Sequence, residues 1–137
     1  MITRCSNNYG THHFPEKLIP LFITNLLEDK KVPVYGNGKN VRDWLHVDDH
    51  CRGIFTVLQK GKSGEVYNAG GRQLSCSIIE AVTTLENLLD KKAKLNYNPI
   101  ARTGDHRWYI SDMNKFKKAY NWNNKKSLMD IYEELCK

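Results

Sequence analysis

The sequence lacks any long apolar run, and no stretch approaches the 18 or so residues that a membrane-spanning helix needs. Its first residues also lack the basic, apolar and small-residue pattern of a secretory signal. Cysteine is sparse and no pair has C-x-x-C spacing, since the four cysteines are Cys5, Cys51, Cys76 and Cys136. We therefore expect no membrane association, zinc site or disulfide framework, and we expect reduced thiols in a cytoplasmic protein.

Charge of one sign is in excess, but it is not concentrated. Lys and Arg number 21 against 15 Asp and Glu, which gives a net charge of +6. The lysines occur as short, separated pairs, a pattern typical of a solvated surface. This distribution argues against a nucleic-acid partner. A small anion such as a diphosphate is a better match, because a few well-placed arginines suffice to hold it.

Helical and strand patterns alternate along the chain, without repeats or low-complexity tracts. The patterns predict strands at 2–7, 32–35 (followed by a glycine turn to 39), 41–47, 64–71 and 94–100. They predict helices at 14–31, 49–61, 77–92, 113–121 and 128–137. This alternation indicates an α/β architecture of short strands and helices, and we expect residues 1–137 to form a single domain.

Several polar residues precede these helices and are predicted to cap them. Ser77 and Glu80 have the S-x-x-E spacing of a capping box, in which each side chain satisfies a free backbone N–H. Asp48, Asp112 and Ser127 stand directly before other predicted helices and are expected to be N-caps.

Two loops have the composition of a site for an anionic, sugar-like ligand. In "CSNNYGTHHFPEKLIP", Asn7 and Asn8 offer uncharged donors and acceptors, and Lys17 lies where a helix begins. In "RTGDHRWY", Arg102 and Arg107 lie beside aromatic residues that can stack on a ring. The alternatives are that the asparagines only form a turn and that the arginines only cover the surface.

Five blocks of the sequence together resemble a known family. "TRCSNNYG", "FPEKLIPL", "PVYGNG", "VRDWLHVDDH" and "GEVYNAGG", in this order and spacing, resemble the C-terminal half of nucleotide-sugar 4,6-dehydratases, most closely those acting on dTDP-glucose. These enzymes belong to the extended short-chain dehydrogenase superfamily. The resemblance implies NAD-dependent loss of water from a nucleotide-activated hexose, which gives a 4-keto-6-deoxy sugar.

The resemblance also implies roles for individual residues. Asn8 would lie near the nicotinamide end of NAD, and the partner would be a nucleotide-diphosphate sugar. The implied substrate-binding residues are Asn7, Lys17, Leu18, Pro33, Val34, Tyr35, Arg42, Ser77, Arg102, His106, Arg107 and Tyr109. No catalytic or metal-binding residue is implied within this chain.

Two positions depart from the dehydratase pattern. The chain has the order Gly104-Asp105-His106 where these enzymes usually have Gly-His-Asp, and it has Ser77 where they often have asparagine. The order Gly-Asp-His found in this chain is similar to that of some CDP-sugar 2-epimerases. A part of a related sugar-nucleotide epimerase or decarboxylase, or a non-catalytic sugar-nucleotide-binding module, is therefore the alternative.

The NAD-binding signatures of the family are absent from the sequence. No G-x-x-G-x-x-G is present, and the single Y-x-x-x-K, from Tyr35 to Lys39, encloses two glycines and is predicted to be a turn. His46 and His50 straddle a strand-to-helix junction, so we expect no metal site there. We therefore expect a substrate-binding portion that lacks the N-terminal Rossmann half and is inactive alone. Its helix 49–61 and strand 41–47 should expose an apolar face that favours a homo-oligomer or the missing half as partner.

Overall fold

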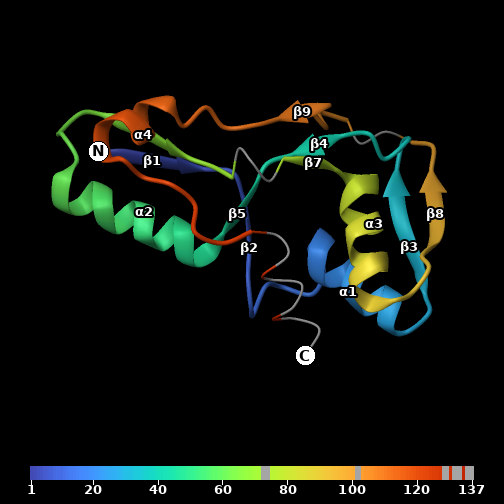
Figure 1. The fold of residues 1–137 in the computed structure, drawn as a ribbon. Coiled ribbons are helices and arrows are strands. Elements are labelled where there is room, and N and C mark those ends of the chain that lie inside the picture. The colour runs from blue at the N-terminus through green and yellow to red at the C-terminus, as the bar shows by residue number, and fades with distance from the viewer. Residues whose placement is uncertain (72–74, 101–102, 128–129, 131–133, 135–137) are drawn as a thin grey trace.

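The computed structural model describes residues 1–71, 75–100, 103–127, 130 and 134. Short strands and helices alternate among these residues, which confirms the predicted α/β class (Figure 1). In chain order the elements are β1 (Ile2–Cys5), β2 (Asn7–Tyr9), α1 (Leu18–Leu27), β3 (Lys31–Tyr35), β4 (Val41–Arg42), β5 (Trp44–His46), α2 (Val47–Lys60), β6 (Val66–Ala69), β7 (Cys76–Ser77), α3 (Ile78–Leu89), β8 (Lys94–Asn98), β9 (Trp108–Tyr109) and α4 (Asn114–Tyr120).

The strands form four small sheets. β1 pairs with β6, β2 with β5, and β3 with β8, all in parallel, while β4 lies between β7 and β9. In Figure 1, β2 and β5 run through the middle of the molecule, with α2 and α4 on one side and α1 and α3 on the other. The paired strands are far apart in sequence, so the folded chain brings its N-terminal residues against its centre.

The first and third predicted strands are each divided in two by one residue. Ser6 separates β1 from β2, so Asn7 and Asn8 lie in a strand and not in the predicted loop. Asp43 separates β4 from β5 because its backbone N–H donates to the carbonyl of Tyr109 at 3.1 Å, while its carbonyl accepts from Asn7 at 3.1 Å. The chain thus passes from one sheet to another at Asp43.

The helix starts match the predictions in part. The capping box of α3 is confirmed: Ser77 Oγ accepts from the N–H of Glu80 at 3.2 Å, and Glu80 Oε2 accepts from the N–H of Ser77 at 2.7 Å. The prediction that Asp48 caps α2 is wrong. The N-cap is His46, whose Nδ1 accepts from the N–H of Asp48 at 3.0 Å, so the helix begins one residue before Asp48.

The other two predicted caps lie near the C-terminus. Met113 occupies the N-cap position of α4, and Asp112 supports the first turn by accepting from the N–H of Asn114 at 2.9 Å. Ser127 Oγ accepts from the N–H of Asp130 at 3.3 Å, as a capping serine does. The predicted helix 128–137 itself lies largely outside the described residues.

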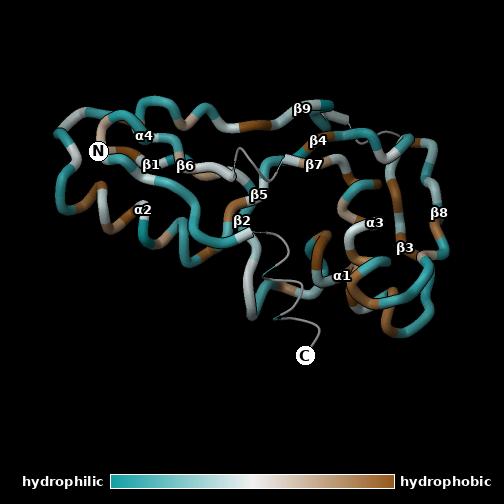
Figure 2. The backbone as a smooth tube through the Cα atoms, viewed as in Figure 1, coloured by the Kyte–Doolittle hydropathy of each residue, from teal (hydrophilic) through white to brown (hydrophobic). Residues whose placement is uncertain are grey.

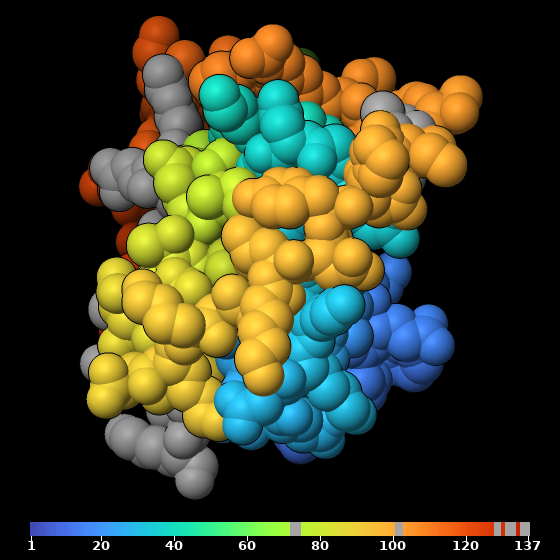
Figure 3. Space-filling model, turned by 90° about the vertical axis from the view of Figure 1, so that its right-hand side faces the viewer, coloured from blue at the N-terminus to red at the C-terminus, as the bar shows by residue number. Residues whose placement is uncertain are grey.

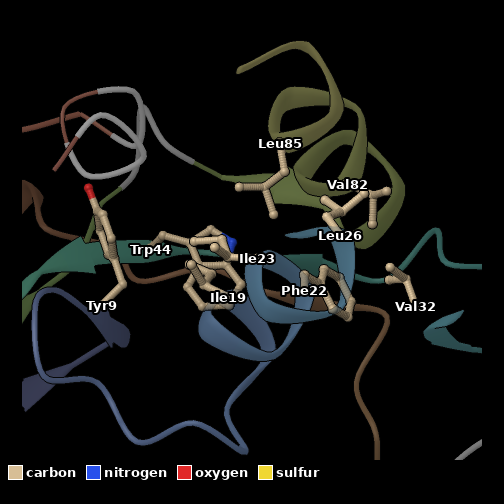
Figure 4. Close-up of a cluster of buried hydrophobic side chains, with 9 residues drawn as sticks. All are labelled: Tyr9, Ile19, Phe22, Ile23, Leu26, Val32, Trp44, Val82 and Leu85. Carbon is tan, nitrogen blue, oxygen red and sulfur yellow. The ribbon is translucent and has the colours of Figure 1, made fainter. Parts of the chain in front are cut away.

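The buried apolar residues form two clusters. Figure 4 shows the first, in which side chains of α1 and α3 point toward one another: Tyr9, Ile19, Phe22, Ile23, Leu26, Val32, Trp44, Val82 and Leu85. The second lies among α2, β6 and α4: Leu45, Val57, Tyr67, Ala69, Met113, Phe116 and Trp122. The clusters meet at β5, which contributes one residue to each.

The outer surface of α2 carries apolar side chains among polar ones. Phe55 and Leu58 are 59% and 68% exposed, and Val47 at the helix start is also exposed. Figure 2 shows hydrophobic and hydrophilic residues interspersed along α2. The expectation of an exposed apolar face is therefore confirmed for the helix. It is wrong for the strand, since Trp44, Leu45 and His46 are all buried. None of the described helices combines the length and hydropathy that crossing a bilayer requires.

Candidate functional site

A cleft of about 510 Å³ opens between the start of α1 and the strands β3 and β4. The strand β8 pairs with β3, and its side chains are exposed on the outer surface (Figure 3). The cleft is lined by Asn7, Asn8, His13, Glu16, Lys17, Leu18, Leu21, Phe22, Pro33, Tyr35, Asn40, Arg42, Trp44, Ile78 and Asp105. Apolar walls with a few charged and amide groups are typical of small-molecule sites.

More than half of the predicted site residues line this one cleft. They are Asn7, Asn8, Lys17, Leu18, Pro33, Tyr35 and Arg42. The strands β2, β3 and β4 and the N-cap of α1 supply them, so segments up to 35 residues apart in sequence converge. No single segment of the chain forms this site.

The remaining predicted residues that the structure describes do not line the cleft. Val34 is completely buried, because alternation along β3 turns it to the face opposite Pro33 and Tyr35. Ser77 is engaged in the capping box of α3, and its neighbour Ile78 reaches the cleft. His106, Arg107 and Tyr109 lie on the loop and strand beyond the cleft. Arg102 lies outside the described residues.

Among the described residues, Arg42 is the arginine that lines the cleft, and its guanidinium is held by several hydrogen bonds. Its Nη1 donates to the carbonyls of Val41 at 2.8 Å and of His106 at 2.7 Å. Its Nη2 forms an ion pair with Asp105, whose other carboxylate oxygen accepts from Asn40 Nδ2 at 2.7 Å. The strand β4 thus presents a fixed cation to the cleft.

Asn8 is oriented by two hydrogen bonds. Its Nδ2 donates to the carbonyl of Ser6 at 2.9 Å, and its Oδ1 lies 2.8 Å from Nδ1 of His50. Burial lowers the pKa of His50, so the neutral imidazole donates this hydrogen bond near neutral pH. His50 therefore fixes which face of the Asn8 amide meets the cleft.

Sequence reasoning missed several lining residues. Asn40 and Trp44 flank Arg42 at i−2 and i+2, and side chains two apart on extended backbone share a face, so the spacing would have found them. His13 and Glu16 lie beside Lys17 in the same sequence block. Burial, and secondarily the charge of Lys17, lower the pKa of His13, which keeps it uncharged near neutral pH.

The described residues form no cluster for a metal ion, and the half-buried Cys76 is not a thiolate. No group of three His, Cys, Asp or Glu side chains among them is placed to hold a metal ion. Burial raises the pKa of Cys76 to about 11, so its thiol is protonated at neutral pH. The segment from Tyr35 to Lys39 is confirmed as a turn, with positive φ at Gly36 and Gly38.

Known proteins are similar to this chain in both sequence and fold. The sequence profile described as the NAD dependent epimerase/dehydratase family matches residues 1–70. A dTDP-glucose 4,6-dehydratase of an Actinoplanes species is 63% identical over 115 residues, which are 84% of this chain and 36% of that enzyme. The chain thus spans little more than a third of the length of this relative.

Solved structures agree with the sequence relatives. The dTDP-glucose 4,6-dehydratase of Bacillus anthracis, in complex with NAD, has a TM-score of 0.87 at 46% identity and covers 96% of this chain and 42% of its own. A UDP-glucuronic acid 4-epimerase of Bacillus cereus, in complex with UDP-glucuronic acid and NAD, has a TM-score of 0.88 at 30% identity, with the same coverage. The fold is therefore common to dehydratases and epimerases, while the sequence is closer to the dehydratases.

Proposed function

Because this chain belongs to the NAD dependent epimerase/dehydratase family, we propose that its cleft binds a nucleoside-diphosphate sugar. In this proposal residues 1–137 are the substrate-binding domain of an enzyme similar to dTDP-glucose 4,6-dehydratase. The identity of 63% to one such enzyme supports the dehydratase class.

The observation that carries the proposal is the convergence of predicted ligand-binding residues on one cleft. Arg42 supplies a guanidinium for the diphosphate, and charge-assisted hydrogen bonds of this kind are the strong ones. Lys17 adds a second cation at the start of α1, where backbone N–H groups also favour anions. The amides of Asn7 and Asn8 are suited to sugar hydroxyls and a carboxamide.

The same proposal makes the whole enzyme an NAD-dependent lyase. NAD, held mainly by the rest of that enzyme, would supply hydride-transfer chemistry for the loss of water. The described residues do not fit NAD by themselves: the turn at Gly36–Gly38 joins two strands, whereas a dinucleotide pyrophosphate needs a glycine turn that opens a helix. Asn8 is the one residue here that we assign to the cofactor, and we propose that this chain is inactive alone.

The alternative is a part of a sugar-nucleotide epimerase. The epimerase structure matches the fold as well as the dehydratase structure does, but its sequence identity is 30% against 46%. The order Gly104-Asp105-His106 is the feature that favours it.

We treat residues 1–137 as one domain because β5 contributes to both hydrophobic clusters.

Calorimetric titration tests the proposal. The chain is titrated with dTDP-glucose, UDP-glucose, CDP-glucose and GDP-mannose, with and without NAD. We expect dTDP-glucose to bind most tightly, and a preference for UDP- or CDP-glucose would support the epimerase alternative. Equal lack of affinity for all four would overturn the proposal.

Two variants locate the binding to the cleft. Arg42→Ala is expected to weaken dTDP-glucose binding at least tenfold, because a charged hydrogen bond contributes roughly 1.5–3 kcal/mol. Lys17→Ala, which alters an exposed side chain outside the Arg42 network, is expected to weaken it less. Arg4→Ala is the matched control, since Arg4 is exposed on β1 and is not part of the cleft. Thermal unfolding of each variant verifies that the fold is retained.

A further inference from the structure

Asp105 occupies the position at Arg42 that an anionic ligand would take. Its carboxylate pairs with Nη2 of Arg42 through one oxygen and accepts from Asn40 Nδ2 at 2.7 Å through the other. Asp105 itself lines the cleft. The side chains of Arg42 and Asp105 are only 14% and 29% exposed, so solvent screens this ion pair less than an open surface pair.

The Nη1 group of Arg42 is also engaged. Nη1 donates to the carbonyls of Val41 and His106. A phosphate oxygen that approaches the guanidinium therefore meets a cation whose Nη2 already holds a carboxylate. Two anions at the same guanidinium repel each other, so the Asp105 carboxylate opposes the binding of the ligand there.

Asn40 strengthens the hold on Asp105. Asn40 and Arg42 lie two residues apart and present their side chains to the same cleft. Together they bind both oxygens of the Asp105 carboxylate, as they would bind two oxygens of a phosphate. When Asp105 leaves, the amide donor of Asn40 and one donor of Arg42 become available together.

We propose that Asp105 is an internal competitor for Arg42 that sets the affinity of the cleft for a diphosphate. The inference rests on the proposed function of the cleft and adds a residue that opposes binding. A ligand binds only the fraction of molecules in which Arg42 is free, so its apparent dissociation constant rises as that fraction falls. Asp105 occupies the position where the resemblance places histidine, so this competition distinguishes the chain from the usual dehydratase pattern.

The test compares the affinity of dTDP for the original chain and for Asp105→Asn by calorimetry. Asn has nearly the same shape but no charge, so we expect dTDP to bind about tenfold more tightly. Asp105→Ala is the second variant and is expected to show the same gain. Asp90→Asn is the matched control, because Asp90 is exposed at the far end of α3, in a left-handed conformation that Asn also adopts.

The outcomes separate this inference from the proposed function. If the original chain binds dTDP and the Asp105 variants bind it no more tightly, or more weakly, the competition is overturned and the proposed function stands. If only the Asp105 variants bind dTDP, both the competition by Asp105 and the proposed function are supported. If neither the original chain nor any variant binds dTDP, the proposed function is overturned, and the inference with it.

Discussion

Trp44 and Leu45 are neighbours in β5, yet their side chains belong to different hydrophobic clusters. Trp44 packs with α1 and α3, while Leu45 packs with β6 and α4. Successive side chains of a strand point to opposite faces, so this pair joins the two halves of the molecule. Trp44 also lines the cleft, and His46, the residue after Leu45, caps α2. The geometry of the site thus depends on the packing of both clusters.

Asp49 is expected to be a major contributor to stability. It is buried, accepts from Arg52 at 2.7 Å and accepts from the backbone N–H of Lys125 and Lys126 at 2.8 and 3.0 Å. Asp49→Ala leaves these donors without their acceptor, and should lower the free energy of unfolding by about 3 kcal/mol in urea denaturation. Asp48→Asn, at an exposed neighbour, should change it by less than about 1 kcal/mol. Equal effects would contradict this role.

Stability should decrease as the pH falls below about 6.5. Burial lowers the pKa of His46 and His50, so the unfolded chain binds protons at a pH where the folded chain does not. Their contribution is complete above the ordinary histidine pKa and is lost as the pH falls through the lowered values. Urea denaturation at several pH values between about 7.5 and 5, where histidine titrates, measures the free energy of unfolding as a function of pH. His50→Gln should flatten the profile, and an unchanged profile would refute the assignment.

Ser77 is expected to stabilise α3 as its N-cap. Ser77→Ala removes the acceptor for the N–H of Glu80 and should cost about 1 kcal/mol of unfolding free energy. Ser77→Asn should retain most of the stability, since Asn is an equally good N-cap. Thermal unfolding compares the three chains. A Ser77→Asn variant as unstable as Ser77→Ala would show that N-capping at residue 77 does not determine the stability.

Gly71 should tolerate no side chain. A Cβ there would lie 1.6 Å from the carbonyl oxygen of Trp44, so the backbone itself would have to move. Gly71→Ala is expected to cost about 3 kcal/mol or more, the upper range for overpacking. Gly36→Asn is the control, because that position is open and its φ of 58° is one that Asn adopts. Similar unfolding midpoints for both variants would be inconsistent with this close approach.

The apolar face of α2 is expected to drive self-association. Phe55 and Leu58 are mostly exposed on adjacent turns of the helix. Sedimentation velocity should show concentration-dependent association of the original chain, and the double variant Phe55→Ser, Leu58→Ser should reduce it. Leu27→Ser, at an exposed residue at the end of α1, serves as the control. A strictly monomeric original chain would contradict the prediction.

The sequence predicted the type of most elements, because their signals are local. The S-x-x-E box located α3, apolar periodicity located α1, and the glycines after Tyr35 predicted a turn. It did not predict that Ser6 and Asp43 divide two strands. Those breaks follow from hydrogen bonds to Ala69 and Tyr109, which are distant in sequence.

For the site, too, some features could be predicted from the sequence and others could not. Sequence alone predicted most of the residue types and blocks that meet in the cleft, since amides and cations carry polar chemistry whatever their neighbours. Only the tertiary structure decided which of them meet. In the folded chain the Val34 side chain is buried in the core, Ser77 caps α3, and Arg42 pairs with Asp105. Side-chain direction depends on strand register and on contacts between residues far apart along the chain, and no local pattern encodes these.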